Sequence, residues 1–226
     1  MKTSYLSDYK SNAKTSKNKR VSTILYLAPL TQNSYGVNVC PMASDGCAKA
    51  CLFTAGRGAF SNVAKARIKR TDALLSDRNK FVQDIVAEIN HLAAKTDGEL
   101  AVRLNGTSDL KLVEWCASSG LTIAPNVVFY DYTKLPNKAG TRTLETGHKY
   151  VVTLSRSERN EADVIAHLQR GGIAAVVFKD MPDTWHGFKV YDGDSADDLM
   201  LDIVGGGVLG LKAKGKAKQD TSGFVV

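Results

Sequence analysis

The chain has 226 residues, of which 43% are hydrophobic and 23% are charged. This length and composition are typical of one globular domain, and no apolar run approaches the ~20 residues of a membrane-spanning helix. The N-terminal segment has no apolar stretch, so we expect no secretory signal and a cytoplasmic location. Thiols stay reduced there, so clustered cysteines indicate metal binding or catalysis rather than disulfides.

The net charge of +7 is concentrated at the two ends. Residues 1–20 carry six Lys or Arg against Asp8, and residues 212–226 carry four Lys against Asp220. We expect 1–20 to be a basic, partly disordered arm and 21–226 to form a single domain. Basic termini can make weak nucleic-acid contacts through phosphates. Solvated ends are the favoured interpretation, because no aromatic interleaving or recognition motif accompanies the charge.

The first half of the chain predicts one strand, a loop and a long helical region. The β-branched, apolar segment 22–30 predicts a strand, and a loop rich in Gly, Asn and Ser leads from it into the cysteines. Apolar residues at helical spacing predict helix over roughly 61–95, with Asp77 as a cap within it.

From residue 99 onward, strands and helices alternate. Strands are predicted at 99–106, 126–133, 149–155, 173–180, 188–194 and 206–214, and helices at 108–120, 160–172 and 195–203. Nearly continuous apolar strands between helices predict a mainly parallel sheet covered by helices. No GxGxxG follows the first strand, which argues against a dinucleotide-binding fold. We therefore expect an α/β partial or irregular (βα) barrel with about six to seven mainly parallel strands.

Three of the four cysteines, Cys40, Cys47 and Cys51, lie within twelve residues. Structural zinc sites usually use two close pairs of ligands, whereas iron–sulfur clusters tolerate varied spacing. We predict a [4Fe–4S] cluster on these three thiolates, with one iron open to a small polar ligand. A structural zinc site, or a cluster with a fourth protein ligand, is the alternative. Cys116 lies in a predicted helix, where we expect a buried core residue.

Chemistry in parallel α/β folds takes place at the carboxyl ends of the strands, so polar residues just past the strands are the candidate site. Asp109, as an acid or base, and Lys179 are the candidate catalytic residues. The candidate ligand-binding residues are Asn105, Thr107, Ser108, Tyr132, Lys134, Ser155 and Arg156. Structural alternatives stay open. Ser108 or Asp109 can cap the next helix, Tyr132 can pack in the core, and Asp192 with Asp194 is favoured as a turn over a cation site.

Several separated motifs resemble, in order, the bacteriophage family gene product 88. They include YLAPLTQNSYGVNVCPMASDGCAKACLFTAGRG, RLNGTSDL, VVFYDYTK and VYDGD, within a match from about residue 20 to the C-terminus. The resemblance implies a phage protein acting in an infected bacterial host, and it implies no activity.

A weaker similarity is to radical S-adenosylmethionine enzymes, which carry a three-cysteine [4Fe–4S] loop after the first strand of a partial barrel. It implies that Cys40, Cys47 and Cys51 hold the cluster and that S-adenosylmethionine binds the open iron. This chain has the spacing C-x6-C-x3-C where that family usually has C-x3-C-x2-C.

Two functions follow from these features. The first is a [4Fe–4S]-dependent enzyme that uses S-adenosylmethionine or uses the open iron as a Lewis acid. The second is an accessory factor whose metal only holds the loop together and whose basic ends bind nucleic acid or a protein complex. No membrane contact is expected in either case.

Overall fold

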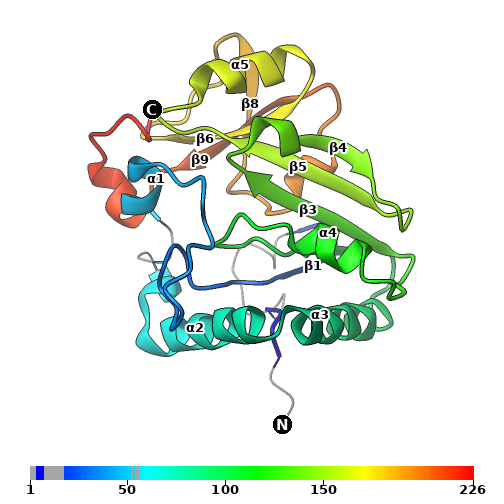
Figure 1. Ribbon diagram of the computed structural model, residues 1–226. Coiled ribbons are helices and arrows are strands. Elements are labelled where there is room, and N and C mark those ends of the chain that lie inside the picture. The colour runs from blue at the N-terminus through cyan, green and yellow to red at the C-terminus, as the bar shows by residue number, and fades with distance from the viewer. Residues whose placement is uncertain (1–3, 8–17, 52, 54–55) are drawn as a thin grey trace.

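The computed structural model describes residues 4–7, 18–51, 53 and 56–226 (Figure 1). Most of the predicted basic arm, residues 1–3 and 8–17, therefore lies outside the described residues. Its described parts contact the domain. Leu6 forms an antiparallel bridge with Leu25, and the backbone N–H groups of Tyr5 and Leu6 donate to the Glu88 carboxylate. In the described part of the chain, no helix is long and apolar enough to cross a membrane.

The fold is built on one nine-stranded sheet with the order β1-β2-β3-β5-β6-β9-β8-β7, and β4 pairs with β5 outside this path. All pairings are parallel except β4–β5 and β7–β8. The strands are β1 (Val21–Ile24), β2 (Leu100–Arg103), β3 (Val127–Thr133), β4 (Gly140–Thr143), β5 (Lys149–Ser155), β6 (Ile173–Phe178), β7 (Thr184–Trp185), β8 (Phe188–Asp192) and β9 (Gly207–Lys212). The predicted α/β fold with a mainly parallel sheet is confirmed. The sheet is open among the described residues, so the barrel stays a prediction.

Five α-helices and four short 3₁₀ turns are found among the described residues. The helices are α1 (Asp45–Lys49), α2 (Ser61–Ser76), α3 (Arg78–Ala93), α4 (Leu112–Ala117) and α5 (Glu161–Gln169). The 3₁₀ turns are η4 (Gly56–Ala59), η5 (Pro136–Lys138), η6 (Leu199–Leu201) and η7 (Gly215–Gln219).

Three predicted segments differ from the structure. The helical region predicted at 61–95 is divided into α2 and α3 at Asp77, which is extended. The Asp77 side chain accepts a hydrogen bond from Lys80 N at 2.9 Å, so the prediction that Asp77 is a helix cap is confirmed. The stretch after β3, which was predicted to be irregular, contains the polar strand β4. This strand pairs with β5, and its side chains are alternately half-buried and exposed. The predicted helix 195–203 is wrong and contains only the turn η6. Its Asp197 side chain accepts hydrogen bonds from Tyr130 and Arg103 instead.

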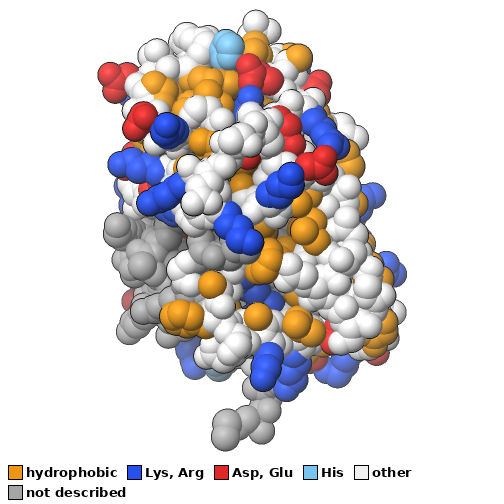
Figure 2. Space-filling model, turned by 90° about the vertical axis from the view of Figure 1, so that its left-hand side faces the viewer, with side chains coloured by type: hydrophobic (Ala, Val, Ile, Leu, Met, Phe, Trp, Pro, Cys, Tyr) orange, Lys and Arg blue, Asp and Glu red, His pale blue; other side chains and the backbone are white. Residues whose placement is uncertain are grey.

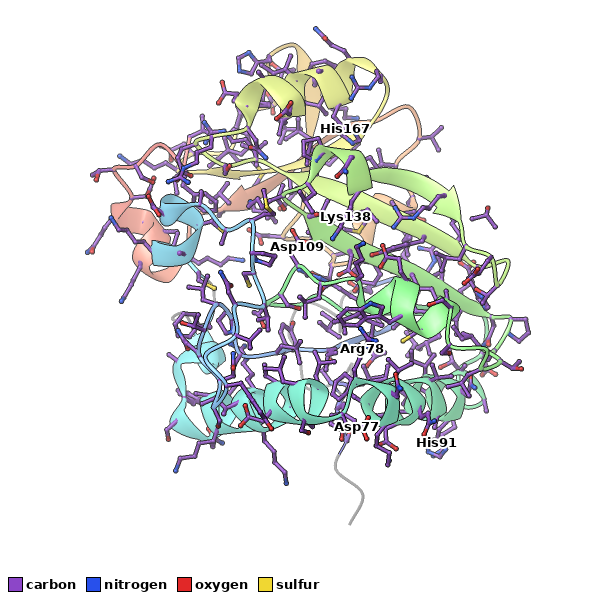
Figure 3. All side chains as sticks on the ribbon, in the orientation of Figure 1. Asp77, Arg78, His91, Asp109, Lys138 and His167 are labelled. Atoms are coloured by element: carbon purple, nitrogen blue, oxygen red, sulfur yellow. The ribbon has the colours of Figure 1, made fainter. Side chains whose placement is uncertain are left out.

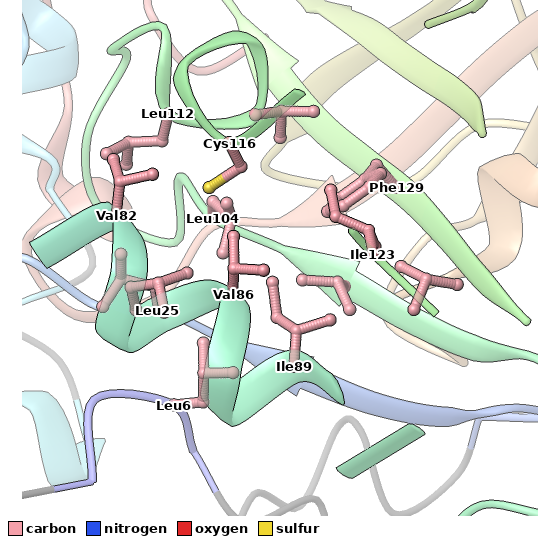
Figure 4. Close-up of a cluster of buried hydrophobic side chains, with 14 of the residues drawn as sticks. Leu6, Leu25, Val82, Val86, Ile89, Leu104, Leu112, Cys116, Ile123 and Phe129 are labelled. Carbon is pink, nitrogen blue, oxygen red and sulfur yellow. The ribbon is translucent and has the colours of Figure 1, made fainter. Parts of the chain in front are cut away.

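The main core lies between the sheet and the helices that cover one of its faces. Val82, Val86 and Ile89 of α3 pack in one cluster with Phe129 of β3 (Figure 4). Cys116 of α4 points into this cluster and is 1% exposed. The prediction that Cys116 is a buried core residue is confirmed.

All the long crossover helices lie on the same face of the sheet. Val152 of β5 packs in the cluster that contains α3 and α4, and Leu154, which points to the same side of β5, packs against α5. The opposite face, which includes Val128 and Val151, is covered by Met200 and other residues around η6. The parallel strands follow one another in chain order from β1 to β6, apart from β4, and β9 and β8 then follow in reverse order.

The carboxyl ends of the parallel strands meet at one edge of the sheet. The loop carrying α1 and the turn η7, coloured red, lie at this edge on the left of Figure 1. Ala50, Ala213, Ala217 and Phe224 form a small buried cluster there, and Cys47 packs against it. The cysteine loop is therefore joined to the C-terminal part of the chain.

Candidate metal and ligand site

The three cysteines lie in one loop at the carboxyl edge of the sheet (Figure 1). The thiol of Cys40 donates to Thr107 O at 3.3 Å, and Asp109 N donates to Val39 O at 2.9 Å, so the loop is tied to the segment after β2. Burial, together with the nearby thiols of Cys51 and Cys47, raises the pKa of Cys40 to about 11. In the described chain, no three His, Cys, Asp or Glu side chains stand at the spacing needed to hold a metal ion.

Glu158 anchors the short helix α1, which carries Cys47. Ser44 caps this helix by accepting from Cys47 N at 3.2 Å and donates its hydroxyl to Glu158 Oε2 at 2.7 Å. Gly46 N donates to Glu158 Oε1 at 2.9 Å. Although burial opposes ionisation, these hydrogen bonds hold the pKa of Glu158 below its usual range. The position of Cys47 is thus fixed by a carboxylate from the segment after β5.

Gly46 lies where a side chain has no room. A Cβ at this position would stand 2.6 Å from Phe224 Cβ and 2.9 Å from Glu158 Oε2, closer than carbon contacts allow. We expect Gly46→Ala to displace α1 and to lower the free energy of unfolding by about 1–3 kcal/mol. Urea unfolding checks this, with Lys49→Ala on the exposed side of the same helix as control. Equal stability of the two variants would contradict the packing described.

Asp109 lies between the cysteine loop and the end of β3 (Figure 3). Its carboxylate accepts from Thr133 Oγ1 at 3.0 Å and from Lys134 N at 3.0 Å. The cap of α4 is Lys111, which makes no side-chain cap hydrogen bond, so the predicted capping role of Ser108 or Asp109 is wrong. Burial raises the pKa of both Cys40 and Cys47, and the Asp109 carboxylate adds to the shift in each.

Lys134 is partly buried and carries an ammonium group near the cysteine loop. Its Nζ donates to Arg156 O at 2.9 Å and lies 5.3 Å from the centre of the Phe224 ring. Burial lowers the pKa of Lys134, while the neighbouring Cys47 and Asp109 oppose this shift. The site therefore contains a cation that can offset charge on a thiolate.

A buried hydrogen-bond network shapes the segment that carries Thr107 and Asp109. Asn105 donates to the Asp131 carboxylate from its backbone N at 2.9 Å and from Nδ2 at 3.0 Å. Asn105 Oδ1 accepts from Ser108 Oγ at 2.8 Å and from Leu110 N at 2.9 Å. Both Asn105 and Ser108, which were candidate ligand-binding residues, are thus engaged within the protein. Their observed contacts fix the loop beside the cysteines.

The buried carboxyl group of Asp131 should make the free energy of unfolding depend on pH. It is 1% exposed, and burial raises its pKa from 3.8 to about 7. Between these values the folded state binds more protons than the unfolded state, so the free energy of unfolding falls as pH rises from 4 to 7, by about 4 kcal/mol in total. We expect Asp131→Asn to remove this fall in denaturant titrations over that range. An exposed-site control, Asp163→Asn, should retain the wild-type profile.

The other candidate residues have separate positions. Thr107 Oγ1 donates to Leu27 O, close to Cys40. The Tyr132 ring lies 4.4 Å from the Arg103 guanidinium on the opposite face of the sheet. Arg156 donates to Glu161 and to the carbonyl groups of Gly223 and Phe224, and so braces the C-terminal segment.

Ser155 and Lys179 make backbone contacts of their own. Ser155 O accepts from Asn160 Nδ2 at 3.1 Å. The side chain of Lys179 is exposed, and its backbone N donates to Val226 O at 2.7 Å. The structure therefore brings Thr107, Asp109 and Lys134 to the cysteines, whereas no described contact joins the Lys179 side chain to them.

The DGD segment after β8 forms a turn. Asp194 N donates to Asp192 Oδ1 at 3.0 Å, and Asp194 pairs with Lys214 at 2.7 Å. The favoured interpretation of Asp192 and Asp194 as a turn is confirmed.

Sequence reasoning missed two residues of this region, Glu158 and Arg67. Arg67 of α2 is 8% exposed and lies with its guanidinium carbon 5.3 Å from the Tyr26 ring centre. A signal for Arg67 was available, because the buried residues of α2 are Arg67, Thr71 and Leu74, at helical spacing. An arginine on the buried stripe of an amphipathic helix needs a partner inside the protein.

The fold and the site together define a mainly parallel α/β protein with three cysteines gathered beside buried charged residues at the carboxyl edge of its sheet. The chain belongs to the gene product 88 family, whose model matches residues 5–226. No curated protein and no solved structure matches the chain. The similarity to radical S-adenosylmethionine enzymes stays a prediction.

Proposed function

We propose that the protein binds a [4Fe–4S] cluster through Cys40, Cys47 and Cys51, with the remaining iron open to a small polar ligand. The observation that carries this proposal is that one short loop carries three cysteines, two of which, Cys40 and Cys47, lie near Asp109. Lys134 lies near Cys47. Three thiolates are a sufficient protein ligand set for a cluster with one open iron. The donor set therefore fits the group.

We further propose that this protein is an enzyme. The cluster, when bound, would supply Lewis-acid activation of a substrate or reductive cleavage of S-adenosylmethionine. The parallel strands from β1 to β6 follow one another in chain order, apart from β4, and their helices lie on one face. This part of the sheet supports a partial-barrel arrangement in which this edge is the active face. Asp109 would hold or accept a proton of the ligand, and Thr107 would orient a polar group beside Cys40. Lys134 would stabilise negative charge.

Purification without oxygen tests the proposal. We expect a broad absorption band near ~400 nm with about four irons and four sulfides per chain. Addition of S-adenosylmethionine should then change the electron paramagnetic resonance spectrum of the reduced protein if that molecule is the ligand. A colourless protein with about one zinc per chain would overturn the cluster.

A second candidate is a metal-stapled factor that binds nucleic acid. Lys and Arg side chains gather on the upper part of the face at the carboxyl edge, with acidic side chains between them (Figure 2). The exposed lysines of the C-terminal segment are Lys212, Lys214, Lys216 and Lys218. Phosphate contacts would make binding weaken steeply with salt. No binding to DNA or RNA at low salt, or binding unchanged after deletion of residues 1–20 and neutralisation of these lysines, would overturn this candidate.

A further inference from the structure

Arg67 is a buried cation with unsatisfied hydrogen-bond donors beside the cysteine loop. The residue is 8% exposed, and its Nε and Nη1 atoms are buried and have no hydrogen-bond partner among the described residues. A buried guanidinium without a compensating charge is strongly unfavourable in a folded protein. This arrangement therefore points to an anion that completes the site.

The surroundings of Arg67 indicate where that anion lies. Burial lowers the pKa of Arg67, and the groups that oppose this shift are Tyr26 and Cys51. Tyr26 presents its ring to the guanidinium at 5.3 Å. The neighbouring Arg70 adds a second positive charge on the same helix.

The Tyr26 ring in turn lies against Gly106, since a Cβ there would stand 2.6 Å from Tyr26 Cδ1. The next residue, Thr107, accepts from the Cys40 thiol, so Arg67 lies on the side of the site that carries the cysteine loop.

The three thiolates outweigh the positive charge of a cluster core or of Zn²⁺, so the occupied site is an anion. We infer that Arg67 is a positioning residue that stabilises the metal–thiolate centre from the side of Cys51. Lys134 provides positive charge from the side of Cys47. The inference rests on the proposed function, but it applies to a zinc centre as well as to an iron–sulfur cluster.

Removal of the Arg67 charge should have opposite effects on the melting temperatures of the metal-free and the metal-loaded protein. In the metal-free protein, Arg67→Met should leave the melting temperature unchanged or raise it, because the variant keeps an apolar stem and removes an uncompensated charge. In the loaded protein, the same change should lower the melting temperature and speed release of iron or zinc to a chelator at least tenfold. Arg67→Lys should recover part of the retention.

The reduction potential gives a readout that packing alone would not change. Loss of a positive charge disfavours the added electron, so Arg67→Met should lower the midpoint potential of the cluster. A tenfold shift in the ratio of reduced to oxidised cluster corresponds to about 59 mV. Lys69→Gln, an exposed position on the same helix, is the matched control and should leave all three measurements unchanged.

The failures of the two proposals differ. A loaded Arg67→Met protein with wild-type metal release and wild-type melting behaviour would overturn the role of Arg67 and leave the metal site standing. Should Arg67→Met not fold, Arg67→Gln gives the same comparison. A wild-type protein that binds neither iron nor zinc would overturn the proposed metal site and this inference together.

Discussion

Replacement of Cys47 by alanine is expected to abolish metal binding, whereas replacement of Cys116 by alanine should leave it intact. Cys47 lies on a helix anchored beside Lys134 and Asp109, so its thiol is a central member of the loop. Cys116 is buried in the helix-covered core, and its truncation should lower the free energy of unfolding by only about 1 kcal/mol. Iron, sulfide and zinc analysis of the two anaerobically purified variants separates these outcomes.

The same measurement distinguishes the proposed ligands from one another. Cys40→Ala and Cys51→Ala should behave as Cys47→Ala does if all three thiolates hold the cluster. Full iron and sulfide loading in any of the three variants would remove that residue from the ligand set. Metal loss in Cys116→Ala without loss of folding would instead assign the fourth cysteine a role that its core position does not suggest.

The second large effect is expected at Asn105, which is 4% exposed. Asn105→Ala removes one of two donors to the buried Asp131 carboxylate, Nδ2, and the acceptor for Ser108 and Leu110 N. The backbone donor at position 105 remains, so we expect the free energy of unfolding to fall by about 3 kcal/mol. This is less than the cost of a buried charge that has no partner.

A matched control for Asn105 is Asn126. Its side chain donates to two backbone carbonyl groups, those of Ala93 and Gly98, and it is only partly buried. Asn126→Ala should lower the free energy of unfolding by about 1 kcal/mol. Equal losses in the two variants, measured by urea unfolding, would show that the network around Asp131 contributes no more than ordinary hydrogen bonds do.

Periodicity and apolar content predicted most of the sheet from the sequence. The segment 149–155 matches β5 residue for residue, and the predicted strands at 126–133 and 173–180 contain β3 and β6. The errors arose where side chains form tertiary hydrogen bonds. Asp197 and its neighbours resemble a helix in composition, but Asp197 accepts from Tyr130 across the sheet. No local pattern contains that contact.

The candidate site could be predicted in location but not in detail. The rule that chemistry follows the carboxyl ends of strands placed Thr107, Asp109 and Lys134 near the cysteines, as observed. It could not distinguish a side chain facing the site from one that supports it, as Asn105 does for Asp131. Glu158 was missed because its partners, Ser44 and Gly46, lie more than a hundred positions earlier in the chain.

The docking of the cysteine loop has a consequence for the order of assembly during synthesis. Phe224 packs in the cluster that holds Cys47, and Val226 exchanges backbone hydrogen bonds with Val177 and Lys179. The loop at 40–51 is therefore translated long before the residues that seat it. Since a ribosome adds roughly 5–20 residues per second, the three cysteines are synthesised on the order of ten seconds before the C-terminal residues that pack against their loop. The proposed metal would therefore meet a complete site only after residues 222–226 have been translated.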